Sequence, residues 1–311
     1  MARCFVTRRL PGPALARLRA EHETEVWPER MPPARDQLLA RTAEAEGLIS
    51  LLTDAVDAEL IAAAPHLRAI SNYAVGTDNV DLEAAAARGI PVGNTPDVLT
   101  DATADLAFAL LLAAARRLPE AAEAVRSGDW VTWEPARHLG ASVRGATLGI
   151  VGLGRIGRAV AQRARGFDME VLATGSSTTA GLSLEALLER SDFVSLHCPL
   201  TPATRHLIDA SALGRMRPTA ILVNTARGAI VDQVALRAAL GKGSIAGAAL
   251  DVTDPEPIPR DDPLLTAPNL LLTPHIGSRT FESVQRQATC AVENLTLYLS
   301  GKPPVAQANV F

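Results

Sequence analysis

The segment from Ala146 to Gly175 constrains the fold of this chain more than any other. A short apolar stretch at residues 147–151 runs directly into the sequence Gly-Leu-Gly-Arg-Ile-Gly at residues 152–157. We expect a strand, a tight turn and a helix through Arg165, because a G-x-G-x-x-G sequence has this structure when it follows a strand. A second strand is expected at residues 169–173, which completes a βαβ unit. This order predicts a dinucleotide-binding site.

Five of the six residues of this glycine loop, all but Leu153, have an expected part in holding a dinucleotide. Gly152 permits the tight turn, Gly154 lets backbone N–H groups approach a pyrophosphate, and Gly157 lets the helix pack close to the strand. Arg155 and Ile156 lie at the N-terminal end of the helix, where the helix dipole favours an anion. We therefore count all five as cofactor-binding residues.

Length and composition favour an ordinary two-domain protein and exclude several other classes. The chain has 311 residues, of which 48% are hydrophobic, enough to bury a large core. Its net charge is −4 and its basic residues are scattered, so we expect no positively charged surface that would attract nucleic acid. The longest apolar run, Leu106 to Ala115, is too short to cross a bilayer, and no export signal is visible. The three cysteines share no metal-ligand spacing, so we expect no metal site and a reducing, cytoplasmic location.

Apolar runs alternate with helical segments along the chain, which predicts an α/β fold with doubly wound parallel sheets. The runs are expected to be strands covered on both faces, because each is continuously apolar. They lie at residues 4–7, 48–52 and 67–71 in the first third of the chain, and at 193–196, 220–223, 248–250 and 270–272 beyond the glycine loop.

Two long helices predict where the chain crosses between two Rossmann-like domains. The first is expected from Ala102 to about Arg117 and the second from about Phe281 to Ser300. The first is apolar on nearly every face, which indicates burial between domains or against a second subunit, so we expect a homodimer. Residues 1–98 and 283–311 would form a flavodoxin-like substrate-binding domain, and residues 99–282 a dinucleotide-binding Rossmann domain, with a ligand cleft between the two.

Three polar residues follow strands of the second domain and form a candidate catalytic set. They are Arg227 in Asn-Thr-Ala-Arg-Gly, Glu256 between two prolines, and His275 in Thr-Pro-His-Ile-Gly-Ser. The carboxyl ends of parallel strands face the cofactor crevice. His275 can donate a proton to a carbonyl oxygen as hydride arrives, and Glu256 would stabilise the imidazolium. Arg227 offers a fork of donors to the carboxylate of a 2-oxo acid.

These motifs resemble the D-isomer-specific 2-hydroxyacid dehydrogenases over nearly the whole chain. The resemblance implies reduction of glyoxylate or hydroxypyruvate to the D-2-hydroxy acid with NAD(P)H, with Arg227, Glu256 and His275 in the roles above. The family's motifs are matched at residues 72–81, 152–157, 224–228, 249–257 and 273–278, and the similarity to glyoxylate/hydroxypyruvate reductases lies at 94–100, 102–105, 126–130 and 133–135.

The resemblance also implies a substrate pocket and further cofactor contacts. Backbone N–H groups of Val75 and Gly76 would bind the substrate carboxylate, and Gly76 allows close approach because it has no side chain. Leu52 would contact the substrate. Asp251 would meet the carboxamide of the nicotinamide, and Ser278 is included among the cofactor-binding residues.

One departure from the family's pattern favours NADP(H) over NAD(H). NAD-preferring folds place an acidic residue after the second strand of the βαβ unit, and this position is Gly175 here. A missing carboxylate removes repulsion against a 2′-phosphate, and Ser176 and Ser177 can donate hydrogen bonds to one. The usual arginine after this position is absent and Arg155 is the nearest basic residue by sequence. NAD(H) therefore stays an alternative cofactor.

Two other functions remain open at this point. A dehydrogenase for 3-phosphoglycerate or D-lactate would use the same fold, although a phosphorylated substrate would need a cluster of basic residues that the sequence does not show. A binding protein that senses NAD(H) without turnover would also keep this fold, since fold alone does not fix function. The absence of long disordered extensions argues against it.

Overall fold

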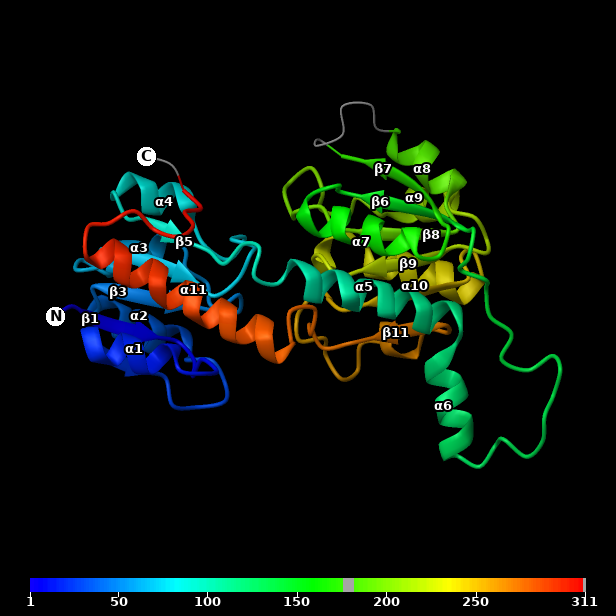
Figure 1. The fold of residues 1–311 in the computed structure, drawn as a ribbon, viewed down its shortest axis with the longest axis horizontal. Coiled ribbons are helices and arrows are strands. Elements are labelled where there is room, and N and C mark those ends of the chain that lie inside the picture. Colours follow the sequence, from blue (N-terminus) through cyan, green and yellow to red (C-terminus); the bar gives the residue numbers. More distant parts are fainter. Residues whose placement is uncertain (176–181, 310–311) are drawn as a thin grey trace. The chain divides into compact units, whose positions relative to one another are not determined.

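The computed structural model describes residues 1–175 and 182–309, and the chain divides into two compact units (Figure 1). Unit 1 comprises Met1–Leu99 and Arg279–Phe311, and unit 2 comprises Thr100–Ser278. The sequence places the first boundary after residue 98, and the units divide after Leu99. The return comes at Arg279 rather than at residue 283, because the last helix begins at Phe281 and belongs entirely to unit 1.

Unit 1 is built on a parallel sheet whose described strands run in the order β2-β1-β3-β4-β5. This order is that of flavodoxin-like sheets. Helices α1 and α11 cover one face, and α2, α3 and α4 cover the other. The bounds are β1 Arg3–Val6, α1 Ala14–Glu21, β2 Glu23–Val26, α2 Arg35–Ala43, β3 Gly47–Ser50, α3 Ala58–Ala63, β4 Ala69–Asn72, α4 Leu82–Ala87, β5 Val92–Gly93 and α11 Phe281–Leu299.

Successive side chains of these strands enter two separate cores, because strand side chains alternate between the faces of a sheet. Phe5, Leu48 and Ile70 pack against α2, α3 and α4. Cys4 and Ile49 pack against α1 and α11. Burial on both faces explains why the sequence shows continuous apolar runs here rather than an alternating pattern.

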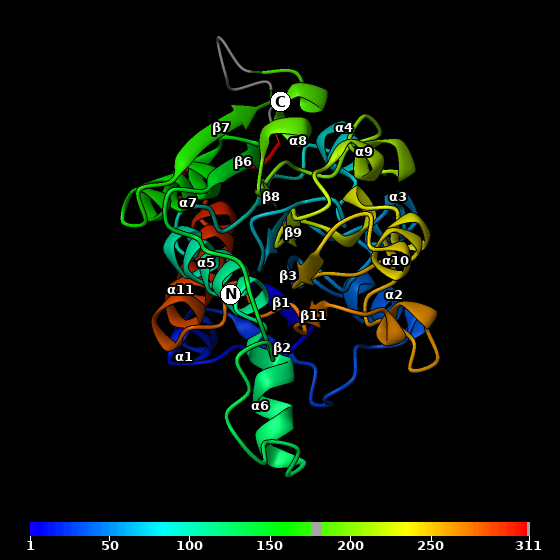
Figure 2. The same ribbon diagram turned by 90° about the vertical axis from the view of Figure 1, so that its right-hand side faces the viewer.

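Unit 2 is built on a second parallel sheet, with the described strands in the order β11-β10-β9-β8-β6-β7. Helices α5 and α7 cover one face, and α8, α9 and α10 cover the other (Figure 2). The bounds are α5 Thr100–Ala115, α6 Leu118–Arg126, β6 Thr147–Val151, α7 Arg155–Arg165, β7 Glu170–Thr174, α8 Leu184–Arg190, β8 Phe193–Leu196, α9 Ala210–Arg215, β9 Ile221–Asn224, α10 Gln233–Lys242, β10 Gly247–Leu250 and β11 Leu270–Leu272, with short 3₁₀ turns at Gly228–Ile230 (η1) and Pro263–Thr266 (η2).

Helix α5 owes its apolar character largely to packing within unit 2. It lies against α7 and against strands β9 and β10, and Phe108, Leu110 and Leu111 are buried in the shared core. The sequence led us to expect burial between domains or against a second subunit. Packing inside one unit explains the same pattern, so the composition of α5 does not by itself require a partner.

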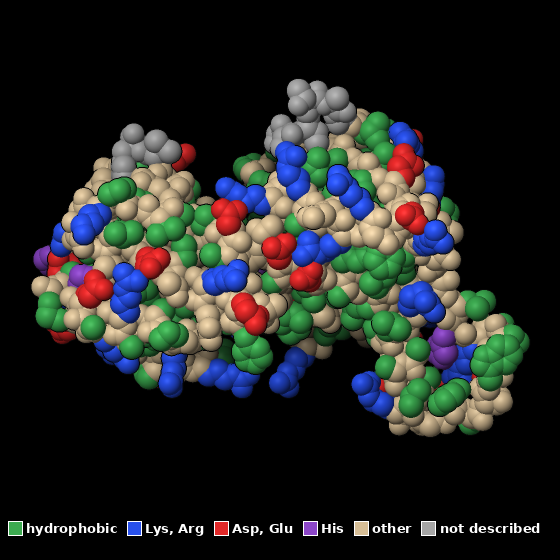
Figure 3. Space-filling view, in the orientation of Figure 1, with side chains coloured by type: hydrophobic (Ala, Val, Ile, Leu, Met, Phe, Trp, Pro, Cys, Tyr) green, Lys and Arg blue, Asp and Glu red, His purple; other side chains and the backbone are tan. Residues whose placement is uncertain are grey.

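Helix α6 and the segment after it project from unit 2 (Figures 1 and 2). We call residues 118–139 the projecting segment. Figure 3 shows hydrophobic side chains gathered on it. Trp130 and Trp133 are 65% and 81% exposed, and Leu139 is 67% exposed. Contiguous apolar surface of this kind marks interaction sites on soluble proteins.

Candidate active site

The glycine loop lies where β6 ends and α7 begins. Gly152 has φ 96°, which favours glycine, and a Cβ there would lie 2.6 Å from the amide nitrogen of Cys198. A Cβ on Gly157 would lie 2.2 Å from the carbonyl oxygen of Gly152. Gly154 is the N-cap of α7, and its Cβ position has no described atom within 4 Å. Neighbouring backbone atoms leave no room for a side chain at Gly152 or Gly157, whereas the space beside Gly154 holds no described atom. This free space fits a pyrophosphate that approaches the N-terminus of α7.

The other predicted cofactor residues of this region lie around the same loop. Arg155 and Ile156 begin α7. Gly175 directly follows β7, has φ 131°, and its Cβ position lies 3.4 Å from the Cα of Gly152. The position that distinguishes NAD from NADP in dinucleotide folds therefore lies beside the loop and carries no side chain. Ser176 and Ser177 lie outside the described residues.

His275 and Glu256 form a close pair in unit 2. The Nδ1 atom of His275 lies 2.5 Å from Oε1 of Glu256, and the two side chains are 23% and 31% exposed. His275 has φ 51°, in the left-handed region that residues other than glycine rarely adopt. Because the carboxylate engages Nδ1, Nε2 is the ring nitrogen left to exchange a proton with a ligand.

Buried Asp251 organises the loop that carries His275. Its Oδ1 accepts hydrogen bonds from Thr273 Oγ1 at 2.6 Å and from the N–H of Ile276 at 2.9 Å. Its Oδ2 accepts the N–H of Gly277 at 2.7 Å, and its carbonyl accepts the N–H of His275 at 2.8 Å. The sequence predicts a nicotinamide contact for this carboxylate. The sequence does not predict that Asp251 also holds the loop, because most of its hydrogen-bond partners are backbone groups.

Arg227 follows β9 in a loop that packs directly on the loop after β10. Asn224 Nδ2 donates a hydrogen bond to the carbonyl of Arg227 at 2.8 Å. Gly228 approaches the second loop so closely that a Cβ there would lie 2.0 Å from the carbonyl carbon of Thr253. Strands β9, β10 and β11 are parallel neighbours, so their C-terminal ends lie at one edge of the sheet. Arg227, Glu256 and His275 all come from the loops that follow these ends.

The predicted substrate residues Leu52, Val75 and Gly76 belong to unit 1. Leu52 lies just beyond β3 and is 38% exposed. Val75 and Gly76 lie in the loop after β4 and are half-buried. No described residue accepts a hydrogen bond from the N–H of Val75 or Gly76. Ser278 is half-buried and is the last residue of unit 2.

His197 also lies beside the glycine loop but has different surroundings from His275. It directly follows β8, and its Nε2 lies 2.8 Å from Ser195 Oγ. Burial lowers the pKa of His197 to about 4. The ring is therefore neutral at pH 7 and is not a proton donor in the neutral range.

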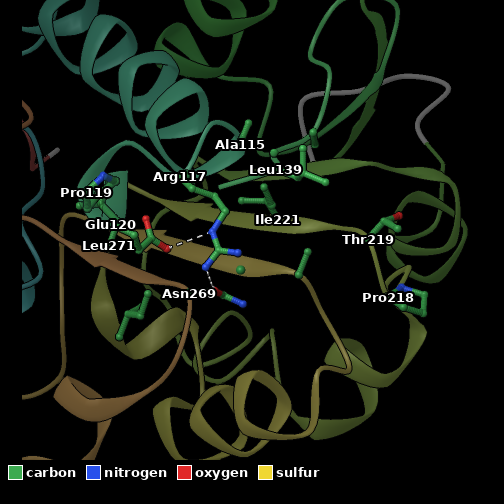
Figure 4. A pocket seen from close by; sticks show the side chains of 16 residues that line it. Ala115, Arg117, Pro119, Glu120, Leu139, Pro218, Thr219, Ile221, Asn269 and Leu271 are labelled. Carbon is green, nitrogen blue, oxygen red and sulfur yellow. Dashed lines mark hydrogen bonds and ion pairs between the residues drawn. The ribbon is translucent and has the colours of Figure 1, made fainter. Parts of the chain in front are cut away.

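A pocket of about 490 Å³ lies at the opposite edge of the unit 2 sheet, where β9 and β10 begin (Figure 4). Arg117 points into it, with Nε 3.6 Å from Glu120 Oε1 and one terminal nitrogen 3.2 Å from Asn269 Oδ1. The predicted catalytic residues do not line this pocket, because they follow the ends of the strands rather than their starts. Within the described ranges, no side-chain cluster could hold a metal ion and no helix is long and apolar enough to span a membrane.

Comparison with known proteins finds similar chains and structures. Residues 108–277 match the family model described as D-isomer specific 2-hydroxyacid dehydrogenase, NAD binding domain. A glyoxylate reductase of Korarchaeum cryptofilum is 50% identical, over 97% of this chain and 94% of the relative. A crystal structure of a protein from Thermus thermophilus is 50% identical with a TM-score of 0.93, over 98% of this chain and 99% of that one. An NADPH-dependent glyoxylate/hydroxypyruvate reductase from Sinorhizobium meliloti, solved with NADP and malonate, is 33% identical with a TM-score of 0.87, over 99% and 96% of the two chains.

Proposed function

Because this chain belongs to the D-isomer specific 2-hydroxyacid dehydrogenase family, we propose that it reduces glyoxylate or hydroxypyruvate to the D-2-hydroxy acid. The observation that carries the proposal is the His275–Glu256 pair, at the same sheet edge as Arg227. The relatives described as glyoxylate reductase and glyoxylate/hydroxypyruvate reductase support the same substrate class. A bound nicotinamide cofactor supplies the hydride for such a reduction.

The chain's own residues would bind the oxo acid and move one proton. His275 gives a proton from Nε2 to the carbonyl oxygen of the substrate, and Glu256 keeps Nδ1 engaged so that the ring stays in the required orientation. Arg227 binds the carboxylate and polarises the oxo group with its fork of donors. The N–H groups of Val75 and Gly76 would bind the same carboxylate.

The cofactor is a dinucleotide, and we infer that NADPH is preferred to NADH. Gly152, Gly154 and Gly157 would admit the pyrophosphate to the N-terminus of α7. Gly175 places no carboxylate beside the loop to repel a 2′-phosphate, and Arg155 is a nearby cation in the sequence. The Sinorhizobium meliloti relative, which is NADPH-dependent, supports this preference.

We also propose a cytoplasmic homodimer that pairs through the projecting segment. Exposed Trp130 and Trp133 would be buried by a second copy, and isologous pairing is the commonest form of soluble oligomer. Replacing both tryptophans by serine should leave a monomer in light scattering, and a variant still dimeric would argue against this interface. The three cysteines are free thiols, which favours a reducing compartment.

Initial rates with glyoxylate and with hydroxypyruvate, each measured with NADPH and with NADH, test the function. Rapid loss of NADPH absorbance would support both the activity and the inference from Gly175. Turnover that favours NADH would keep the activity and reject the cofactor preference. The absence of turnover with either cofactor would contradict the proposed function.

A further inference from the structure

Three residues of the matched motifs, Asn72, Asn94 and Thr95, fix the carbonyl groups of the loop after β4. Each carbonyl from Ala74 to Gly76 accepts a hydrogen bond from a neighbouring group of unit 1. The pairs are Ala74 O with the N–H of Thr95 at 2.9 Å, Val75 O with Asn94 Nδ2 at 2.9 Å, and Gly76 O with Asn72 Nδ2 at 2.9 Å.

Fixing these carbonyls also fixes the N–H groups of the same peptide units. In a trans peptide the C=O and the N–H point in opposite directions. Thr95 therefore directs the N–H of Val75 away from itself, and Asn94 does the same for the N–H of Gly76. No described residue accepts either N–H group. The loop thus presents two oriented donors to a ligand.

The two asparagines are themselves held in place. The carbonyl of Asn94 accepts a hydrogen bond from Asn294 Nδ2 of α11 at 2.8 Å. Asn72 is fully buried, its Oδ1 accepts Ser50 Oγ at 3.1 Å, and its Nδ2 lies 3.0 Å from Asn79 Oδ1. The loop is therefore held from two sides, by Asn94 with Asn294 and by Asn72 with its neighbours Ser50 and Asn79.

We propose that Asn94 is a positioning residue for substrate binding. Its side-chain amide fixes the peptide unit between Val75 and Gly76, so that the N–H of Gly76 is aimed at the carboxylate of the 2-oxo acid. The inference rests on the proposed function, which puts that carboxylate on this loop. Asn94 acts through the carbonyl of Val75 rather than by contact with the substrate.

Removing the Asn94 amide should weaken substrate binding more than it slows the chemical step. A peptide unit that is free to rotate must be ordered when the carboxylate binds, and the cost falls equally on the bound substrate and the transition state. Asn94→Ala should raise KM for glyoxylate about tenfold or more, with kcat within roughly threefold of wild type. Asn94→Asp keeps the size but replaces the donor with an oxygen that repels the Val75 carbonyl, so it should raise KM at least as much.

Asn309→Ala provides a matched control in the same unit. Asn309 Oδ1 accepts the N–H of Val92 at 2.8 Å, and its Nδ2 donates to the carbonyl of Ile90 at 2.9 Å. This variant also removes a buried amide that holds backbone groups, but it leaves the loop after β4 untouched. It should lower Tm as the Asn94 variants do while KM stays unchanged.

The experiment combines steady-state KM and kcat with calorimetric titration of oxalate into each protein bound to NADP⁺. A rise of about tenfold in KM and in the oxalate Kd for both Asn94 variants, with NADP⁺ affinity unchanged, is the expected result. Folded Asn94 variants with KM and oxalate Kd within roughly twofold of wild type, or an equal rise in Asn309→Ala, would overturn the inference.

Failure of the proposed function gives a different result. If the wild-type protein reduces neither oxo acid, the function is wrong, and oxalate binding alone then decides on Asn94. If wild type binds oxalate and the Asn94 variants bind it with a Kd about tenfold higher, the positioning role is supported. Oxalate that wild type does not bind would overturn it.

Discussion

The backbone carbonyl of Asp251 accepts the N–H of His275 at 2.8 Å. The carboxylate of the same residue accepts the N–H groups of Ile276 and Gly277. The N–H groups of three successive loop residues thus donate hydrogen bonds to Asp251, which is only 1% exposed. The position of the imidazole therefore depends on a buried carboxylate that need not touch the substrate.

Asp251→Asn should destabilise the protein and slow turnover together. Both carboxylate oxygens of Asp251 accept hydrogen bonds, so the NH₂ group that replaces one of them would face an N–H or hydroxyl donor. A buried donor left unpaired in this way costs about 1–3 kcal/mol. Urea unfolding should show a loss of free energy of unfolding in that range, and kcat should fall by roughly tenfold or more. Wild-type stability in this variant would mean that Asp251 does not hold the loop.

His275→Ala should remove the proton donor and leave the cofactor site intact. We expect kcat to fall by about a hundredfold or more, because general acid catalysis contributes at least that much. NADPH affinity, measured by fluorescence titration, should not change. His206→Ala is a suitable control, since exposed His206 also has a left-handed backbone, with φ 53°. Near-normal turnover of the His275 variant would refute the assigned role.

Glu256→Gln tests the charge of the carboxylate while keeping its size. The amide can still accept the Nδ1–H of His275, but charge-assisted hydrogen bonds are roughly twice as strong as neutral ones. We expect kcat to fall roughly ten- to a hundredfold with little change in KM. Asp254→Asn removes an exposed carboxylate of the same loop and should have little effect. Equal effects of both changes would show that the loop's net charge, rather than the pair, matters.

Two glycine variants should separate folding from cofactor binding. Gly154→Ala adds a Cβ that meets no described atom within 4 Å, so its Tm should stay close to that of wild type. The same Cβ would obstruct the pyrophosphate, and NADPH affinity should drop about tenfold or more. Gly157→Ala adds a Cβ that lies 2.2 Å from the carbonyl oxygen of Gly152, so its Tm should fall clearly. The reverse order of the two Tm values would contradict this account.

His197 should make the folded state less stable in acid. Burial lowers the pKa of its imidazole from 6.5 to about 4. Below about pH 6.5 the unfolded chain therefore binds a proton that the folded chain does not, so the free energy of unfolding falls as pH drops from 6.5 toward 4. His197→Gln should show a shallower loss over that window in urea unfolding at several pH values. Identical slopes for the two proteins would exclude this contribution.

The family and the fold class were predictable because both depend on local patterns. The family predicted from the motifs is confirmed by the family model and by relatives of about 50% identity. The α/β fold is confirmed as well, and strands β8 and β11 have the predicted bounds. Strand β2, Glu23–Val26, escaped the sequence reasoning because it lies at a sheet edge and carries two glutamates.

The sequence predicts candidate site residues but not the contacts that hold them in place. Sequence order places His275 and Glu256 after neighbouring strands, which is enough to expect them at one edge. The hydrogen bonds of Asp251 and Asn94 to backbone groups depend on how loops fold, and no residue spacing encodes them. The left-handed backbone of His275 is equally invisible, since nothing in its side chain demands it.

The close approach of Gly228 to Thr253 restricts how this site can be redesigned. A Cβ on Gly228 would lie 2.0 Å from the Thr253 carbonyl carbon, so neither loop can gain bulk there without displacing the other. An engineer who transplants the Arg227 loop from a homologue must transplant the Glu256 loop with it. A change that adds bulk to one loop at this contact should therefore need a compensating change in the other.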